Sequence, residues 1–383
     1  MPDRPNIHIF ENAEIVMPDR VQRGWVAVDD GRIIEIGEGA APERGLDLAG
    51  DYLLPGLVEL HTDHLESHYA PRPKVRWHPL GAVLAYDAQI ASSGITTVFD
   101  SLRAGVDVDG GGLGAELLAL AEALDDARRH GLFRCEHLTH LRCEVPSPDV
   151  VETVENFVSV FPVHLISLMD HTPGQRQFRD LDKYFTYYGG KTGKSDAEIR
   201  QAVQRKTNEN AALSAMNRPA LVKMAAQRGI RLASHDDTTL DEVHQSIHEG
   251  VAIAEFPTTI EAARASHKNG ITVMMGAPNL IRGGSHSGNV AAEELAREGV
   301  LDILSSDYVP ASLLMAAFDL PRRAAGITLP DAIATVTRNP ARSAGLQDRG
   351  EIASGQRADI VRVSVVGGVP VVRQVWLEGR RVA

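Results

Sequence analysis

The chain has 383 residues, of which 43% are hydrophobic and 23% charged, and its net charge is −12. This composition is ordinary for a globular enzyme, and the length suits one large domain plus a small one. The negative charge argues against a protein that binds nucleic acid or an anionic membrane, although a locally basic pocket can still bind a small anion. No signal peptide, transit peptide or long apolar segment is visible, so the cytoplasm is the expected compartment. Cys135 and Cys143 stand too far apart along one extended segment to form a disulfide.

Short β-type runs occupy both ends of the chain. Residues from about Ile7 to Glu38 hold apolar runs separated by the turn Asp29-Asp30-Gly31, and the same texture returns from Asp359 to Leu377. Because the two ends resemble each other and differ from the middle, we expect them to meet. The prediction is a small β-sandwich domain of residues 1–52 and 346–383 beside a larger domain of residues 53–345.

The middle of the chain alternates apolar β-rich runs with helical patterns. Such alternation is typical of βα units around a parallel sheet. Eight runs qualify as strands, which predicts an α/β fold with a (β/α)8 barrel of the TIM type. The runs are Leu57–His61, Ile95–Asp100, Phe133–Cys143, His164–Met169, Ile230–Ser234, Ile253–Phe256, Ile271–Met275 and Leu301–Ser305.

The first of these strands ends in two potential metal ligands, His61 and Asp63. Side chains of a strand alternate between its faces, so these two point the same way, about 7 Å apart along the backbone. One divalent cation can be held by such a pair. In a barrel, the carboxyl end of a strand also marks the catalytic face.

Polar residues follow four further strands: Glu144, Asp170-His171, His235-Asp236-Asp237 and Asp307. The carboxyl ends of all barrel strands lie on one rim, so these side chains are expected to converge. Taken singly, each has an ordinary explanation: Glu144 could be a solvated loop residue, Asp307 could be a helix N-cap, and Asp236 or Asp237 is expected to be one. Taken together, histidine nitrogens and carboxylate oxygens favour zinc or a similar divalent ion, such as manganese or iron.

Several motifs resemble a known superfamily. The run Leu54-Pro55-Gly56-Leu57-Val58-Glu59-Leu60-His61, the bracketing β-rich ends and the aspartate after the last strand resemble the amidohydrolase superfamily of metal-dependent hydrolases. The familiar first motif there is His-x-His, whereas this chain has His61-Thr62-Asp63. Within the superfamily, the chain is similar to the diphosphatases of the carbon–phosphorus lyase (phosphonate) pathway. The segments that carry this likeness are 61–66, 71–75, 141–144, 167–175, 233–237, 276–279, 282–289 and 305–308.

The resemblance implies a binuclear metal site. His61 and Asp63 would bind the first ion, Glu144 would bridge both, and His171 and His235 would bind the second. Asp307 would contact metal and the attacking water, and it is the expected catalytic residue. The superfamily usually places its histidines after strands five and six, whereas the predicted strands place His171 and His235 after four and five, which leaves open a missed strand. The role of His64 also stays open.

Cations near the strand ends suggest an anionic substrate. Arginine's planar guanidinium suits phosphate and phosphonate oxygens. Lys74, Arg176 and Arg282 are the favoured substrate-binding residues, with His286 as a further candidate. The stretch from Gly283 to Gly288 could present backbone N–H groups to an anion or could be a flexible loop.

The function that the resemblance implies is hydrolysis of a ribosyl phosphonate triphosphate to its 5-phosphate and pyrophosphate. A metal-activated hydroxide would be the nucleophile, because water between two divalent ions loses a proton near neutral pH. The alternative is an amidohydrolase that cleaves a C–N bond, in a cyclic amide or an N-acyl amino acid. A third hypothesis is a non-catalytic scaffold on the same fold. A homodimer is the expected assembly.

Overall fold

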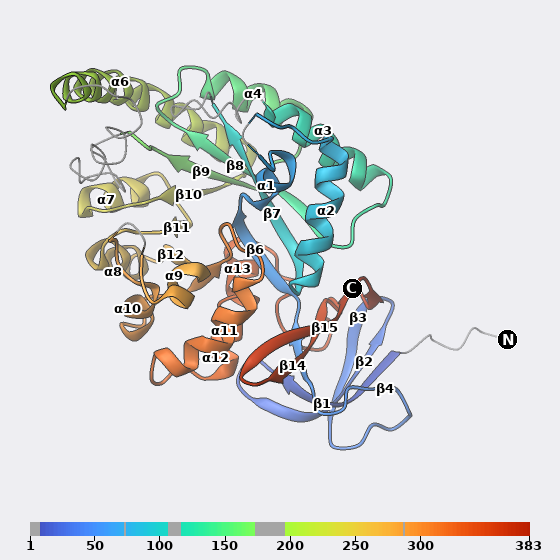
Figure 1. Ribbon diagram of the computed structural model, residues 1–383. Coiled ribbons are helices and arrows are strands. Elements are labelled where there is room, and N and C mark those ends of the chain that lie inside the picture. Colours follow the sequence, from blue (N-terminus) through green and yellow to red (C-terminus); the bar gives the residue numbers. More distant parts are fainter. Residues whose placement is uncertain (1–7, 73, 106–115, 173–195, 286–287) are drawn as a thin grey trace.

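The computed structural model describes residues 8–72, 74–105, 116–172, 196–285 and 288–383. Eight parallel strands form one sheet, and neighbours in this sheet are also neighbours along the chain (Figure 1). Each overlaps one of the eight predicted strands, which confirms the predicted barrel. They are β6 (Leu57–Thr62), β7 (Ile95–Ala104), β8 (Glu136–Glu144), β9 (Leu165–Met169), β10 (Arg231–His235), β11 (Ile253–Glu255), β12 (Thr272–Gly276) and β13 (Ile303–Ser305).

The barrel is nearly closed by contacts between its first strand, β6, and its last, β13. A parallel bridge joins Thr62 to Asp307, and the Thr62 hydroxyl donates to the Asp307 carbonyl at 2.7 Å. The buried Glu59 carboxylate accepts hydrogen bonds from the Ser305 hydroxyl at 2.7 Å and from the Ser306 N–H at 2.5 Å. These contacts bring together strand ends that lie more than 200 residues apart in the sequence.

Helices follow the strands and cover the outside of the barrel (Figure 1). In α3 the buried residues Leu117, Leu120, Ala121 and Leu124 recur at helical spacing, so this helix packs one apolar face inward. The helices are α1 (His64–Tyr69), α2 (Pro79–Ser92), α3 (Leu117–Arg129), α4 (Val150–Val160), α6 (Asp196–Arg228), α7 (Leu240–His248), α8 (Ile260–Lys268), α9 (Ala277–Arg282), α10 (Ala292–Arg297), α11 (Ser312–Arg323), α12 (Leu329–Ala334) and α13 (Arg338–Ser343).

The two ends of the chain meet in a second, mostly antiparallel sheet, as predicted. The short strand β5 joins its halves, because it pairs with β1 on one side and with β14 on the other. Phe10, Ile15, Leu53, Ile360 and Trp376 form part of the core of this sheet. The strands are β1 (His8–Val16), β2 (Val21–Asp29), β3 (Arg32–Glu38), β4 (Leu46–Asp47), β5 (Tyr52–Pro55), β14 (Ile360–Val366), β15 (Val369–Leu377) and β16 (Arg380–Arg381).

The terminal sheet joins the barrel at the amino ends of the barrel strands. Only Gly56 separates β5 from β6, and a Cβ at this position would lie 2.1 Å from the Thr96 hydroxyl oxygen, so the close approach requires glycine. Arg357 donates to the Glu136 carboxylate at the start of β8 at 2.7 Å. The opposite end of the barrel is therefore free for a site. The domain boundaries themselves stay a prediction, and by its pairing β5 extends the terminal sheet to Pro55.

Two expectations from composition concern the two cysteines and long apolar segments. Cys135 and Cys143 are both free and buried. Among the described residues, none of the helices is both long and apolar enough to span a membrane.

Candidate active site

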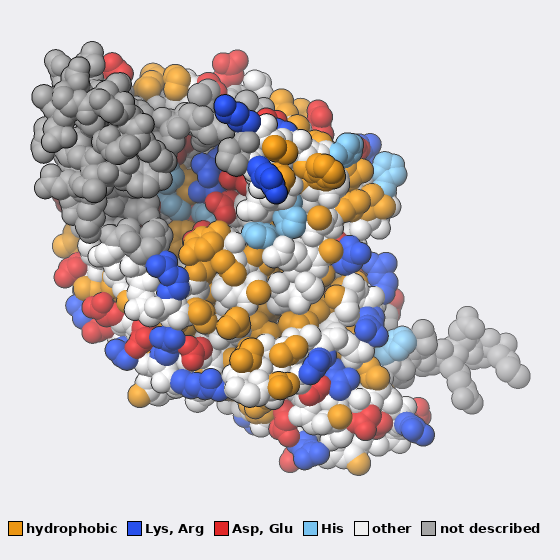
Figure 2. Space-filling model, viewed as in Figure 1, with side chains coloured by type: hydrophobic (Ala, Val, Ile, Leu, Met, Phe, Trp, Pro, Cys, Tyr) orange, Lys and Arg blue, Asp and Glu red, His pale blue; other side chains and the backbone are white. Residues whose placement is uncertain are grey.

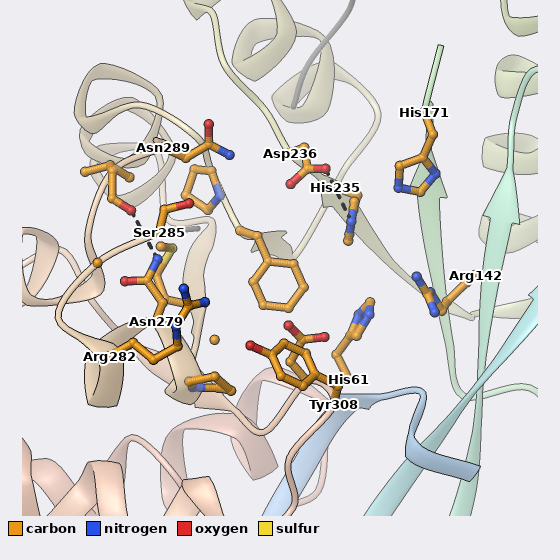
Figure 3. Close-up of a pocket in the computed structure, with 18 residues that line it drawn as sticks. His61, Arg142, His171, His235, Asp236, Asn279, Arg282, Ser285, Asn289 and Tyr308 are labelled. Atoms are coloured by element: carbon orange, nitrogen blue, oxygen red, sulfur yellow. Dashed lines mark hydrogen bonds and ion pairs between the residues drawn. The ribbon is translucent and has the colours of Figure 1, made fainter. Parts of the chain in front are cut away.

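A pocket lies at the carboxyl ends of the barrel strands (Figure 3). Histidine, acidic and basic side chains gather in a hollow of the surface over this end of the barrel (Figure 2). Four of the six predicted metal ligands line the pocket: His61, His171, His235 and Asp307. The other two, Asp63 and Glu144, lie next to residues that line it. The convergence expected from the strand ends is therefore present.

His61 and Asp63 stand two residues apart at the end of β6, and their side chains have different partners. The His61 side chain is buried and lines the pocket. Its pKa lies well below the usual range, because burial disfavours the charged ring and the positive charge of Arg142 adds to the effect. The ring is therefore neutral, as a metal ligand must be. The Asp63 carboxylate instead accepts a hydrogen bond from Arg142 at 3.0 Å.

Glu144 and His171 form one unit at the ends of β8 and β9. The Glu144 carboxylate accepts the His171 backbone N–H at 2.9 Å, and its other oxygen lies 2.6 Å from His171 Nδ1. Burial alone would raise the pKa of Glu144, but the adjacent His171 outweighs burial and lowers it. Glu144, His171 and His235 do follow the third, fourth and fifth barrel strands. No further strand enters the barrel within the described part of the chain, so the predicted strand count is confirmed.

His235 ends β10 and lines the pocket. Burial lowers its pKa to about 3, so the ring is neutral. Its Nε2 lies 3.5 Å from the carboxylate of Asp236, which also lines the pocket. The predicted N-cap role of Asp236 or Asp237 is wrong, because Thr239 caps α7 with a capping box. Asp236 has a φ of 57°, and the Asp237 carboxylate accepts from the Ser246 hydroxyl at 3.0 Å.

Asp307 follows β13 and lines the pocket with a φ of 54°. It is not a helix N-cap, since α11 begins after Ala311. Burial, together with the charge of Asp63, raises the pKa of Asp307 to about 7. A carboxyl group with a pKa near neutrality can both accept and release a proton at physiological pH.

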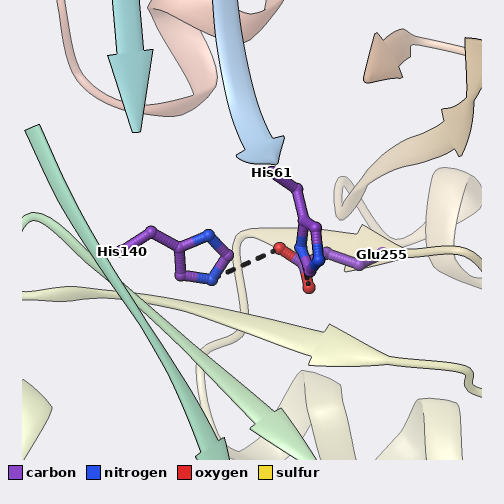
Figure 4. Close-up of side chains that lie close together, drawn as sticks. All are labelled: His61, His140 and Glu255. Atoms are coloured by element: carbon purple, nitrogen blue, oxygen red, sulfur yellow. Dashed lines mark ion pairs between the residues drawn. The ribbon is translucent and has the colours of Figure 1, made fainter. Parts of the chain in front are cut away.

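Two residues at the base of the pocket were missed by the sequence-based prediction: Glu255 on β11 and His140 on β8. Both are fully buried. Ligand atoms of His61, His140 and Glu255 lie within 4.8 Å of one another (Figure 4), and so do those of His171, His235 and Asp236. The available signal was a single acidic residue inside the apolar run Ile253-Ala254-Glu255-Phe256. A charged residue in such a strand is rarely buried without a partner.

The opposite side of the pocket comes from α9 and the segment that follows it (Figure 3). Arg282, one of the residues predicted to bind substrate, lines the pocket there together with Ser285 and Asn289. Asn279 also lines it, and its side-chain oxygen Oδ1 accepts the Ala292 N–H at 2.9 Å, which ties the segment to α9. The pocket therefore has a side rich in histidine and carboxylate and a facing side with a guanidinium and amides.

Only one of the other predicted substrate-binding residues, Lys74, can be compared with the described pocket. Lys74 is exposed and lies outside it. Arg176 and His286 fall outside the described residues, and so does part of the stretch from Gly283 to Gly288, of which Gly284 lines the pocket. His64 bridges two elements: its Nδ1 lies 3.0 Å from the Tyr308 carbonyl oxygen and its Nε2 3.1 Å from the Gln89 side-chain oxygen.

The donor set fits a divalent cation. His61 Nδ1 and Glu255 Oε1 are buried atoms that have no hydrogen-bond partner among the described residues. Neutral imidazoles and carboxylates are the donors that zinc and similar ions take in proteins. A buried carboxylate beside neutral histidines is also a place where a positive charge would be stabilised.

Comparisons with known proteins agree with this architecture. The sequence pattern described as "Amidohydrolase family" matches residues 52–382. The chain is 46% identical over 377 residues to the alpha-D-ribose 1-methylphosphonate 5-triphosphate diphosphatase of Escherichia coli (strain K12), with 98% of this chain and 100% of that protein covered. It is 26% identical over 383 residues to an adenine deaminase of Nitratidesulfovibrio vulgaris, of which it spans 57%.

Solved structures show the same fold at low sequence identity. The N-acetyl-D-glucosamine-6-phosphate deacetylase of Mycobacterium smegmatis aligns with a TM-score of 0.65 at 15% identity, with 98% of this chain and 99% of that chain covered. The N-isopropylammelide isopropylaminohydrolase of Burkholderia multivorans aligns with a TM-score of 0.64 at 17% identity, with 98% and 97% covered. The barrel and the terminal sheet therefore belong to one shared architecture.

Proposed function

The chain belongs to the amidohydrolase family, and from this premise we propose that it is a metal-dependent diphosphatase. Its substrate would be α-D-ribose 1-methylphosphonate 5-triphosphate, cleaved to the 5-phosphate and pyrophosphate in phosphonate catabolism. The observation that carries the proposal is the 46% identity to the Escherichia coli diphosphatase over the whole length of both chains. The pocket supports it, because Arg282 faces the histidines and carboxylates across a space open to a ligand.

The proposed metal centre uses the six residues expected from the sequence: His61, Asp63, Glu144, His171, His235 and Asp307. A bound divalent ion lowers the pKa of a coordinated water and polarises a phosphoryl oxygen. Asp63, which pairs with Arg142 in this structure, would act as a ligand once its carboxylate releases Arg142 and binds the ion. We infer two ions and favour zinc, since the donors are imidazoles and carboxylates. A cytoplasmic location and a homodimer complete the proposal.

The chain's own residues would carry the remaining steps. Asp307 lines the pocket and would take the proton from the attacking water. Arg282 would hold phosphate oxygens through its planar guanidinium and so fix the chain of phosphates across the pocket. As charge moves to the departing pyrophosphate, this cation would stabilise the leaving group.

The test is direct. Purified, metal-loaded protein is incubated with the ribosyl phosphonate triphosphate, and phosphorus NMR follows the release of pyrophosphate. We expect pyrophosphate and the 5-phosphate in equal amounts, and we expect Asp307→Asn to slow the reaction by ~10²–10⁴-fold, the usual contribution of a general base. Absence of pyrophosphate with metal-loaded protein would contradict the proposal.

Hydrolysis of a C–N bond is the competing function. The matched adenine deaminase supports including it, although the chain is only 26% identical to that protein and spans 57% of it. Release of ammonia from adenine and ring opening of cyclic amides are assayed with the same metal-loaded protein. Turnover of one of these substrates without pyrophosphate release would favour this alternative.

A further inference from the structure

Glu255 lies beneath the pocket and is close to three histidines, of which His61 and His140 are drawn in Figure 4. One carboxylate oxygen, Oε2, lies 3.0 Å from His235 Nδ1 and 3.1 Å from His61 Nδ1. The other, Oε1, lies 3.7 Å from His140 Nε2. A single carboxylate therefore lies between two of the proposed metal ligands, one on β6 and one on β10.

The position of this carboxylate is itself fixed. Ile253 belongs to the apolar cluster inside the barrel, and Glu255, two residues later on the same strand, points to the same face. The Ser167 hydroxyl donates to Oε2 at 2.7 Å, and the same hydroxyl contacts His140 Nε2. His140 Nδ1 in turn lies 2.9 Å from the Leu60 carbonyl oxygen. Strands β6, β8, β9 and β11 together hold Glu255 in place.

The hydrogen bond with Glu255 selects one neutral form of His235. A neutral imidazole has one N–H and one free lone pair, and an N–H next to a carboxylate is placed on the nitrogen that faces it. For His235 that nitrogen is Nδ1, which leaves the Nε2 lone pair on the side of Asp236 and the pocket. His61 Nδ1 lies 3.1 Å from the same carboxylate oxygen without a hydrogen bond to it, and the His61 ring lines the pocket.

The charge of Glu255 also lacks a fixed counter-charge. Within the described residues, its ion-pair and hydrogen-bond partners are histidines and Ser167, and none is a lysine or arginine. A buried carboxylate of this kind is stabilised when a cation binds nearby.

We propose that Glu255 is a positioning residue that accepts a hydrogen bond from His235 Nδ1–H, lies against His61 Nδ1, and thereby presents the Nε2 atoms of both rings to a divalent ion. The role rests on the proposed metal centre and adds to it a residue that does not touch the substrate. Carboxylates that orient ligand histidines typically change metal affinity by about 10–100-fold when they are removed.

The test compares Glu255→Gln and Glu255→Asp with a matched control, Asp87→Asn. Asp87 is also a buried carboxylate beside a buried histidine, 3.4 Å from His137 Nε2, but it lies outside the pocket. Zinc affinity is measured by competition with a chromophoric chelator, the cobalt-substituted proteins are compared by visible absorption, and thermal unfolding of the metal-free proteins is recorded.

We expect Glu255→Gln to weaken zinc binding by about 10–100-fold and to change the cobalt spectrum. The metal-free Glu255→Gln protein should unfold close to the wild-type temperature, because the substitution removes an uncompensated buried charge. Glu255→Asp should retain part of the affinity, and Asp87→Asn should lower stability without changing affinity or spectrum. Wild-type zinc affinity and an unchanged cobalt spectrum in Glu255→Gln would overturn the proposal.

One further variant separates positioning from direct metal ligation. If Glu255 bound an ion of its own with His61 and His140, then His140→Gln would lose one equivalent of metal, and this result would overturn the positioning role. We expect full stoichiometry in His140→Gln. Wild-type protein that binds no metal would overturn the metal centre and the role of Glu255 together. Wild-type protein that binds metal but releases no pyrophosphate would contradict only the proposed activity.

Discussion

Two buried networks in this barrel combine histidine with carboxylate and have opposite protonation. At the base of the pocket, one carboxylate, Glu255, is shared between His61 and His235, and burial lowers the pKa of His235 to about 3. In the barrel wall, His137 lies between two carboxylates, 3.0 Å from Asp100 and 3.4 Å from Asp87. There burial also opposes the charge, but Asp100 and Asp87 outweigh it and raise the pKa of His137 to about 9.

The ratio of carboxylates to histidines explains the difference. With three histidines (His61, His140 and His235) around one carboxylate, the rings stay neutral and keep lone pairs that can bind a metal. With two carboxylates to one histidine, the ring is a cation that forms a structural ion pair. The same residue types therefore serve ligand binding in one place and stability in the other, and substitutions can separate the two roles.

The largest expected effect is on activity, at the pocket. His235→Ala removes a proposed ligand, so we expect it to lose metal and to reduce pyrophosphate release by more than ~100-fold, beyond the effect of removing a residue that only orients a ligand. The protein should stay folded, because the side chain faces a pocket. Metal analysis, turnover and circular dichroism check this, and unchanged metal content would remove His235 from the centre.

The second-largest expected effect is on the stability of the protein and comes from the His137 network in the barrel wall. His137→Ala leaves Asp87 and Asp100 buried without their shared cation, which should lower the free energy of unfolding by about 3–5 kcal/mol. The folded fraction should bind zinc as wild-type protein does. Urea unfolding and zinc titration check the two parts, and a loss of zinc affinity would break the separation between the networks.

The pH dependence of stability should reveal the charged network. The pKa of His137 is raised from 6.5 to about 9 on folding, so both states hold the proton below pH 6.5. Between pH 6.5 and about 9 the unfolded chain loses its proton first, and stability on the order of 3 kcal/mol is lost as the pH rises. Urea unfolding across this range measures the slope. His137→Gln should flatten it, and an equal slope in that variant would assign the effect to another group.

The smallest effect concerns the exposed cations. Arg282 lines the pocket, and Arg282→Ala should raise KM for the triphosphate substrate by about 10-fold, as expected when a charged hydrogen bond is lost. Lys74 is exposed and outside the pocket, so Lys74→Ala should change KM by less than about twofold, as is usual for surface substitutions. Initial rates across substrate concentrations compare the two, and equal effects would contradict the described pocket lining.

Much of the architecture could be predicted from local patterns. Apolar runs bounded by turn residues predicted all eight barrel strands, and the β-rich ends predicted the second sheet. The convergence of His61, His171, His235 and Asp307 followed from a general property of parallel barrels, in which the carboxyl ends of the strands share one rim.

The predictions that failed depended on partners distant in sequence or on competing local groups. Asp236 was expected to cap a helix, but Thr239 stands at the helix start with Glu242 three residues later, and this capping box takes the role. Glu255 has no neighbours in the sequence that mark it as a partner of histidines. Its contacts come from β6, β9 and β10, which only folding brings around it.

The sequence by itself thus determined the kind of fold, the rim on which polar side chains gather and the residue types available to bind a cation, because these follow from periodicity and strand direction. The tertiary structure alone decided which charges meet. In the folded chain Arg142 hydrogen-bonds to Asp63, and Glu255 contacts both His61 and His235. His137 lies between two buried aspartates. Protonation depends on distances of a few ångströms in a buried environment, and such distances are set only when separate strands close into a barrel.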